Sequence, residues 1–165
     1  MNKKNIYLLT QAAMIAALYV VLTFIANAFG LANYSVQVRF SEALTILPFF
    51  TPAAIPGLFI GCLISNILTG CAIPDIIFGS LATLIAAFGT WNLRGIGNVF
   101  LSPLPPILAN TIIVPFVLRY AYGIRPLWLS FLTVGAGEII SCGILGLLLA
   151  FTLNKYRAQI FRENF

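Results

Sequence analysis

Long apolar segments fill most of this chain and leave few ways for it to fold. Hydrophobic residues make up 61% of the 165 residues and charged residues 8%, and the mean hydropathy is +1.02. A water-soluble domain could not bury this much apolar surface, so the surface must face lipid. About six spans of roughly 20 residues fit this length. We therefore expect one domain, residues 1–165, that is an all-α integral membrane protein with a bundle of six transmembrane helices.

Proline, glycine and polar residues mark the ends of the apolar segments. The second segment is short, and the last is the longest and carries several glycines that allow close helix approach. The expected helices are Ile6–Ala26, Val38–Phe50, Ala53–Thr69, Pro74–Trp91, a fifth that is entered through Pro103, Pro105 and Pro106 and ends near Tyr120, and Leu127–Asn154.

The basic residues predict the orientation of the bundle in the membrane. Lysine and arginine together number 9, against 4 acidic residues, and they lie mostly near segment ends. Cytoplasmic sides of membrane proteins carry the excess of basic residues, so we expect both termini to be cytoplasmic. Only Arg39, Arg119 and Arg125 then lie outside. Because the basic residues form no continuous stripe, nucleic acid binding is not expected.

Three of the four acidic residues, Glu42, Asp75 and Glu138, lie inside or at the mouth of apolar segments. An isolated charge at the centre of a bilayer costs about 3 kcal/mol on insertion scales, so such a residue normally faces a partner, a cavity or a substrate. With Arg39, one helical turn before Glu42, these acids predict a polar ligand site. The predicted orientation places Arg39, Glu42 and Asp75 toward the outer face of the membrane and Glu138 deeper in the bundle.

Each of these residues except Glu138 also has a plain structural interpretation. Arg39 and Glu42 are three residues apart and could form a local ion pair. Asp75, beside Pro74, could cap its helix. Glu138 has no basic residue within one helical turn, so a functional role is favoured there.

Four further positions have two interpretations each. Asn110 could bond across helices or read the edge of a heterocycle. Tyr34 and Phe78 could stack on a flat ligand or anchor the chain at the membrane interface. Ala13 and Ala17, four residues apart, would let another helix approach closely, as would Ala12 and Ala16. That helix could belong to this protein or to a partner.

The sequence lacks the residues that several functional classes require. There is no His, no metal-ligand cluster, no GxSxG sequence and no Walker A sequence. Cys62, Cys71 and Cys142 are interpreted as packing residues, because they form no CxxC pair. We therefore expect no enzymatic activity and no cofactor. Uphill transport would need ion coupling or a separate ATPase.

Four sequence stretches resemble a known family over nearly the whole chain. They are Val38-Arg-Phe-Ser-Glu-Ala-Leu-Thr-Ile-Leu-Pro, Pro74-Asp-Ile-Ile-Phe-Gly-Ser-Leu-Ala-Thr, Pro105-Pro-Ile-Leu-Ala-Asn and Gly135-Ala-Gly-Glu. With six spans and the alanine motif, they resemble the substrate-binding S components of energy-coupling factor (ECF) transporters. More narrowly, they resemble the QueT family, which is associated with uptake of queuosine precursors.

The resemblance implies a division of labour in a bacterial cell membrane. This subunit would bind a 7-deazaguanine-type molecule (preQ0, preQ1 or queuine), while a transmembrane coupling protein (EcfT-like) and two ATPase subunits supply motion and energy. Ala13 and Ala17 would face the coupling protein, and the subunit would topple to release its ligand. Three other functions stay open: a self-sufficient small carrier or channel in which Glu138 and Asp75 relay protons, an ECF S component for a different vitamin-like solute, and a structural membrane assembly factor.

The implied ligand gives the acids specific roles. A 7-deazaguanine offers a ring N–H beside an exocyclic amino group, which one carboxylate can accept together. We expect Glu138 or Glu42 at this edge and Asp75 at the amine of the aminomethyl form. Arg39 would orient a carboxylate or donate to the ring carbonyl.

Overall fold

The computed structural model describes residues 3–31 and 38–161, without the side chain of residue 158, and all regular structure in these ranges is helical. The all-α expectation is therefore confirmed. The α-helices are α1 (Lys3–Ala28), α2 (Ala54–Leu68), α3 (Ile73–Leu93), α4 (Leu104–Tyr122), α5 (Leu127–Glu138), α6 (Gly146–Lys155) and α7 (Arg157–Ile160). Other helical segments are wound differently from an α-helix. The more tightly wound 3₁₀ segments are η1 (Phe40–Phe49), η2 (Arg94–Ile96) and η3 (Val99–Leu101), and the more widely wound π-helical segment is η4 (Ile139–Leu145).

Four helices within the described ranges are long and apolar enough to cross a membrane, so the chain is a multi-pass membrane protein. These are Lys3–Ala28, Ile73–Ile96, Val99–Tyr122 and Leu127–Lys155. The second and third expected segments are shorter, with 10 residues in η1 and 15 in α2. Fifteen α-helical residues extend roughly 22 Å, less than the roughly 30 Å of a hydrocarbon core.

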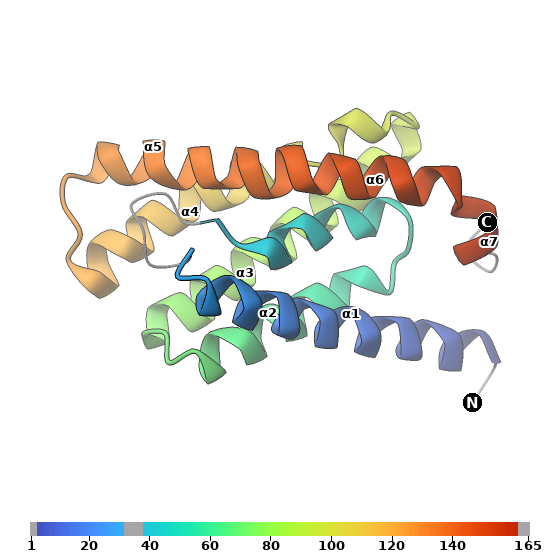
Figure 1. Ribbon diagram of the computed structural model, residues 1–165, viewed down its shortest axis with the longest axis horizontal. Helices are drawn as coiled ribbons and strands as arrows, with labels where there is room; N and C mark the ends of the chain where they lie inside the picture. Colours follow the sequence, from blue (N-terminus) through green and yellow to red (C-terminus); the bar gives the residue numbers. More distant parts are fainter. Residues whose placement is uncertain (1–2, 32–37, 162–165) are drawn as a thin grey trace.

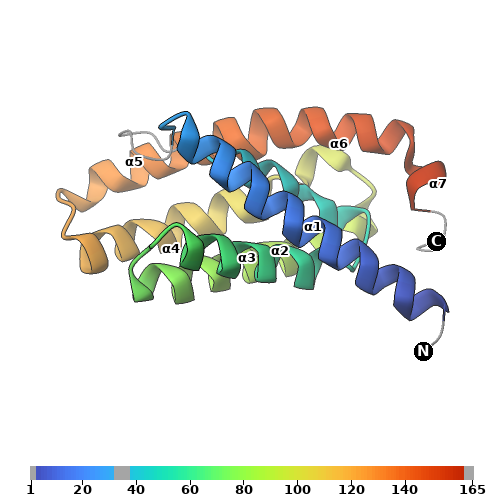
Figure 2. The same cartoon turned by 60° about the horizontal axis from the view of Figure 1, so that its bottom comes forward.

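Close packing of α1 on α2 depends on two glycines of α2. A Cβ atom at Gly57 would lie 2.7 Å from the carbonyl oxygen of Ala12, and one at Gly61 would lie 2.8 Å from the Cβ of Tyr19. Small residues such as glycine allow membrane helices to pack closely against each other. Figure 2 shows α1 crossing obliquely over α2. The Ala12 and Ala16 side of α1 therefore packs within the protein.

The short helix η1 lies at the centre of the bundle. It packs against α1, α2, α3, α6 and η4, and most of its side chains are buried. Its apolar residues Ile46, Phe49 and Leu44 belong to the core cluster. In Figure 1 it runs between α1 and the long helix made by α5, η4 and α6. Its first residues, including Glu42, are thereby held between several helices.

The long C-terminal helix changes its winding directly after Glu138. Ile139–Leu145 form a π-helical segment between α5 and α6, and Ser141 and Cys142 in it are buried. π-helical segments are rare and are frequently found at functional sites. This segment packs against η1, so it brings Ser141 and Cys142 beside the first residues of that helix.

Both described ends of the chain lie at one end of the bundle (Figures 1 and 2). The Tyr7 hydroxyl donates to the carbonyl oxygen of Ile160 at 2.9 Å, and Phe161 stacks on Phe50 with ring centroids 5.6 Å apart. The expected topology requires the termini to lie on the same side. That this side is cytoplasmic stays a prediction.

Candidate functional site

Glu42, Asn110 and Glu138 meet in the interior although they come from three different helices. The Asn110 amide donates to Glu42 Oε2 at 3.3 Å and to Glu138 Oε1 at 3.1 Å. All three side chains are buried. The amide thus joins two carboxylates that would otherwise repel each other. Of the two uses expected for Asn110, the structure contains the bond across helices.

Two further side chains complete this cluster. The Tyr19 hydroxyl of α1 donates to Glu42 Oε1 at 2.6 Å, and the Cys142 thiol donates to Glu138 Oε2 at 3.1 Å. Each carboxylate oxygen of Glu42 and Glu138 therefore accepts one hydrogen bond. Burying a carboxylate in a membrane protein requires such donors.

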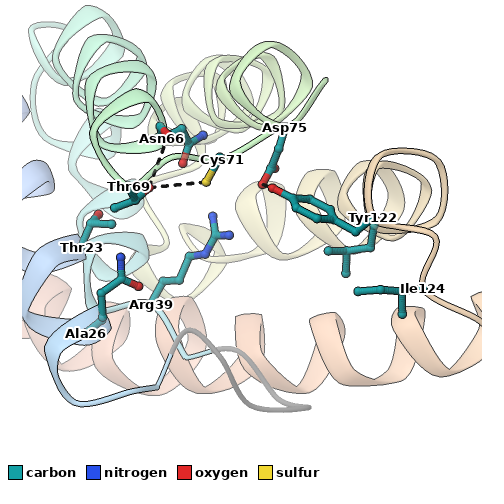
Figure 3. A pocket seen from close by; sticks show the side chains of 11 residues that line it. Thr23, Ala26, Arg39, Asn66, Thr69, Cys71, Asp75, Tyr122 and Ile124 are labelled. Atoms are coloured by element: carbon teal, nitrogen blue, oxygen red, sulfur yellow. Dashed lines mark hydrogen bonds between the residues drawn. The ribbon is translucent and has the colours of Figure 1, made fainter. Parts of the chain in front are cut away.

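A larger cavity of about 230 Å³ lies between this cluster and the bundle end opposite the termini. It is smaller than the roughly 300 Å³ at the lower end of drug-sized pockets, so it suits only a small molecule. Figure 3 shows its polar side chains converging from α2, α3, α4 and the segment before η1. Its walls are formed by Thr23, Ala26, Asn27, Arg39, Asn66, Thr69, Cys71, Asp75, Leu118, Tyr122 and Ile124.

Asp75 lies at the edge of this larger cavity and does not cap its helix. The N-cap residue is Ala72, and Asp75 Oδ2 accepts a hydrogen bond from the Tyr122 hydroxyl at 3.0 Å. The same hydroxyl accepts one from the backbone N–H of Ala72, also at 3.0 Å. Tyr122 therefore fixes the carboxylate from the neighbouring helix α4, and no described residue donates a hydrogen bond to the second oxygen of Asp75.

Arg39 separates the larger cavity from a smaller one of about 20 Å³, and it lines both. Glu42 bonds to Tyr19 and Asn110 instead of forming the local ion pair that its spacing from Arg39 allows. The guanidinium interacts electrostatically with Asp75 and Glu42. The smaller cavity is lined by Arg39, Glu42, Cys62, Gly79, Thr83, Asn110, Val114, Val134 and Glu138. Its volume is enough for about one water molecule.

The two aromatic candidates do not join this group. Phe78 is 51% exposed and lines neither of the two cavities described above. Tyr34 lies outside the described residues. Stacking on a ligand stays a prediction for both, and for Phe78 the exposed position also fits an anchor at the membrane surface.

The acidic cluster has the spacing of a metal site, but Arg39 already supplies a positive charge beside it. Ligand atoms of Glu42, Glu138 and Cys142 lie within 4.8 Å of one another. The thiol already donates to Glu138, and the guanidinium of Arg39 lines the same small cavity. A cation at this point would compete with Arg39 for the same carboxylates.

The two alanine pairs of α1 face opposite ways. Ala12 and Ala16 pack toward α2, while Ala13 and Ala17 are exposed on the surface of the bundle. An exposed pair of small residues four positions apart leaves room for another helix.

Sequence reasoning missed several side chains of this site, among them Tyr19, Asn66 and Tyr122, and it interpreted Cys142 as a packing residue. Asn66 did carry a signal, because it is a lone amide in an apolar segment. Tyr19 and Tyr122 did not, since tyrosines at segment ends or on lipid-facing surfaces are common in membrane helices.

Comparison with known proteins relates the sequence to one family. The queuosine precursor transporter QueT of Lactococcus lactis subsp. cremoris (strain MG1363) is 38% identical over 85 residues, which is 52% of this chain and 50% of that protein. The match thus spans about half the length of this relative. No solved structure matches. The family model described as QueT transporter matches residues 9–155, nearly the whole sequence. The chain therefore belongs to the QueT transporter family.

Proposed function

We propose that this protein is the substrate-binding membrane subunit of an ATP-driven ECF importer for a queuosine precursor: preQ0, preQ1 or queuine. The observation that carries the proposal is the cavity of about 230 Å³ among membrane helices, with Arg39 and Asp75 in its wall. The name of the Lactococcus relative supports the ligand class. A small, polar and partly enclosed cavity fits a fused heterocycle with several hydrogen-bonding groups.

The charges of the site favour a ligand with a positive group. Glu42, Asp75 and Glu138 outnumber the nearby cation Arg39. The amine of an aminomethyl deazaguanine would pair with Asp75, whose Oδ1 is not used by Tyr122. For Glu138 or Glu42 to accept from the base edge directly, Arg39 would have to move aside, because it lies between the two cavities.

The exposed Ala13 and Ala17 surface supports the second part of the proposal, docking to a transmembrane coupling protein (EcfT-like) that works with two ATPase subunits. This surface belongs to the same helix as Tyr19, which bonds Glu42. A partner that moves α1 would therefore also act on the acidic cluster.

Ligand binding is tested by calorimetric titration of the purified protein with preQ0, preQ1, queuine, guanine and several unrelated vitamins. Tight binding confined to deazaguanines is expected. Tight binding of an unrelated vitamin would overturn the ligand class but keep the importer. Failure to bind any of them would favour a structural role in membrane assembly.

Coupling is tested with the double substitution of Ala13→Leu and Ala17→Leu. Affinity for the precursor should stay within about twofold, whereas co-purification with the ATPases and uptake should fall at least tenfold, because the larger side chains block helix approach. The control is Leu18→Met, also exposed on α1 but about 100° around the helix from Ala17. Transport in liposomes by this protein alone would instead support a self-sufficient carrier.

A further inference from the structure

Asn66 of α2 is a buried amide that uses little of its hydrogen-bonding capacity within the part of the chain that the structure describes. Its side chain is 3% exposed and lines the larger cavity. Nδ2 lies 3.6 Å from the Cys62 sulfur, which is a weak acceptor, and Oδ1 accepts no hydrogen bond from the described residues. None of its polar atoms is fully enclosed without a partner, so the cavity gives access to Oδ1. A polar molecule that enters the cavity, water or ligand, can therefore bond this amide.

The amide shares its side of the cavity with Asp75. Asn66 Nδ2 and Asp75 Oδ1 each lie 3.3 Å from the point where a Cβ atom at Gly79 would be. Gly79 lines the smaller cavity, so the two polar groups of the larger cavity lie beside the boundary between the two. In Figure 3, the Arg39 side chain reaches toward these groups from the opposite wall.

We propose that Asn66 binds the ring-amide edge of the ligand, the adjacent ring N–H and carbonyl of a lactam, and thereby selects which heterocycle the site accepts. The proposal rests on the proposed function and names the contact that gives it specificity. One carboxamide offers a donor and an acceptor side by side, so it pairs with a lactam edge through two hydrogen bonds. A carboxylate offers acceptors alone and cannot satisfy the ligand carbonyl.

The neighbours of Asn66 fit this arrangement. Arg39 donates to the second lone pair of the ligand carbonyl, and Asp75, held by Tyr122, accepts from an amino substituent. Glu42 and Glu138 then form the layer beneath, where they balance the charge of Arg39 without touching the base. This differs from the expectation that one of these two glutamates accepts from the base edge.

The test uses the purified full-length protein, preQ1 and an analogue of preQ1 methylated on the ring nitrogen of the lactam. The wild-type protein should bind preQ1 at least tenfold more tightly than the analogue, because the methyl group removes the N–H donor. Asn66→Ala should weaken preQ1 binding at least tenfold and reduce the preference for preQ1 over the analogue to below threefold. Asn66→Asp, nearly identical in size, should also weaken preQ1 binding at least tenfold, since it repels the carbonyl.

Ser65→Ala is the matched control. Ser65 precedes Asn66 on α2, is fully buried and donates to the Cys62 carbonyl oxygen, but it lines neither cavity. This variant should keep both the affinity and the preference. Asn66→Ala with affinity within twofold of wild type and an unchanged preference would overturn the assignment while leaving the proposed function in place. A wild-type protein that binds no deazaguanine would instead overturn both.

Discussion

At the scale of single residues, the Tyr19 hydroxyl connects α1 to the acidic cluster. It donates to Glu42 Oε1 at 2.6 Å in a buried position. Tyr19→Phe removes this donor and leaves a buried carboxylate with one bond fewer, so the protein should lose about 1–3 kcal/mol of stability. Thermal unfolding in detergent measures the loss. The control is Tyr7→Phe, whose hydroxyl makes an exposed bond to Ile160 and should cost less than about 1 kcal/mol.

An equal effect of these two tyrosine substitutions would contradict a special role for the bond from Tyr19 to Glu42. The two variants remove the same atom from the same helix, and they differ in the burial and the charge of the acceptor.

We predict that Glu138 contributes to ligand binding through its charge. Glu138→Gln keeps the side-chain length and the oxygen that accepts from Asn110, but removes the negative charge beside Arg39. Binding of preQ1 should weaken at least tenfold, because Arg39 would then turn toward the remaining acids or repel the ligand amine. Isothermal titration measures the change. Unchanged affinity in a folded variant would exclude Glu138 from ligand recognition.

Sequence reasoning identified Glu42, Glu138 and Asn110 because polar groups in apolar segments need partners. It could not predict that Asn110 bridges the two glutamates, since the three residues are far apart in the chain and meet through helix packing alone. Tyr19 was missed for the same reason. Its role depends on how far α1 lies from η1, which no local pattern encodes.

At the scale of helices, the ends were predicted to within a few residues because proline and glycine mark them. The expected Ala53–Thr69 and Pro74–Trp91 correspond to α2 and α3. The π-helical segment after Glu138, which packs against η1, had no sequence signal. The shortness of η1 was visible in the sequence, but its position at the centre of the bundle was not.

The contact between α1 and α2 should be sensitive to one methyl group. Gly61→Ala would place a Cβ 2.8 Å from the Cβ of Tyr19 and 3.0 Å from the Ala16 carbonyl oxygen. Overpacking of this kind typically costs about 1–3 kcal/mol, and here it also pushes Tyr19 away from Glu42. Thermal unfolding and preQ1 affinity should therefore both decline.

Gly135→Ala is the matched control for this helix contact. Its added Cβ would meet Thr111 Cγ2 at 3.4 Å, an ordinary contact, so stability should stay the same or rise slightly. If Gly61→Ala were as stable as Gly135→Ala, the close approach of α1 to α2 would not be required for the fold.

At the scale of the whole molecule, the two ends of the bundle differ in the basic residues that they carry. The end with both termini also holds Arg94 and Arg157, whose charges act on each other. The other end opens toward the larger cavity and carries the exposed Arg125. The excess of basic residues at the first end predicts that it is cytoplasmic, so the cavity should open to the outside, as an importer requires.

This orientation can be tested on intact cells with a thiol reagent that does not cross membranes. Cys62, Cys71 and Cys142 are first replaced by alanine, because Cys71 lines the cavity and would react itself. Single cysteines are then introduced by Arg125→Cys at the cavity end and Gly95→Cys near Arg94, where an added side chain meets no atom within 4 Å. The cysteine at 125 should react in intact cells, and the one at 95 only after permeabilisation. The reverse pattern would place the cavity on the cytoplasmic side and contradict an uptake function.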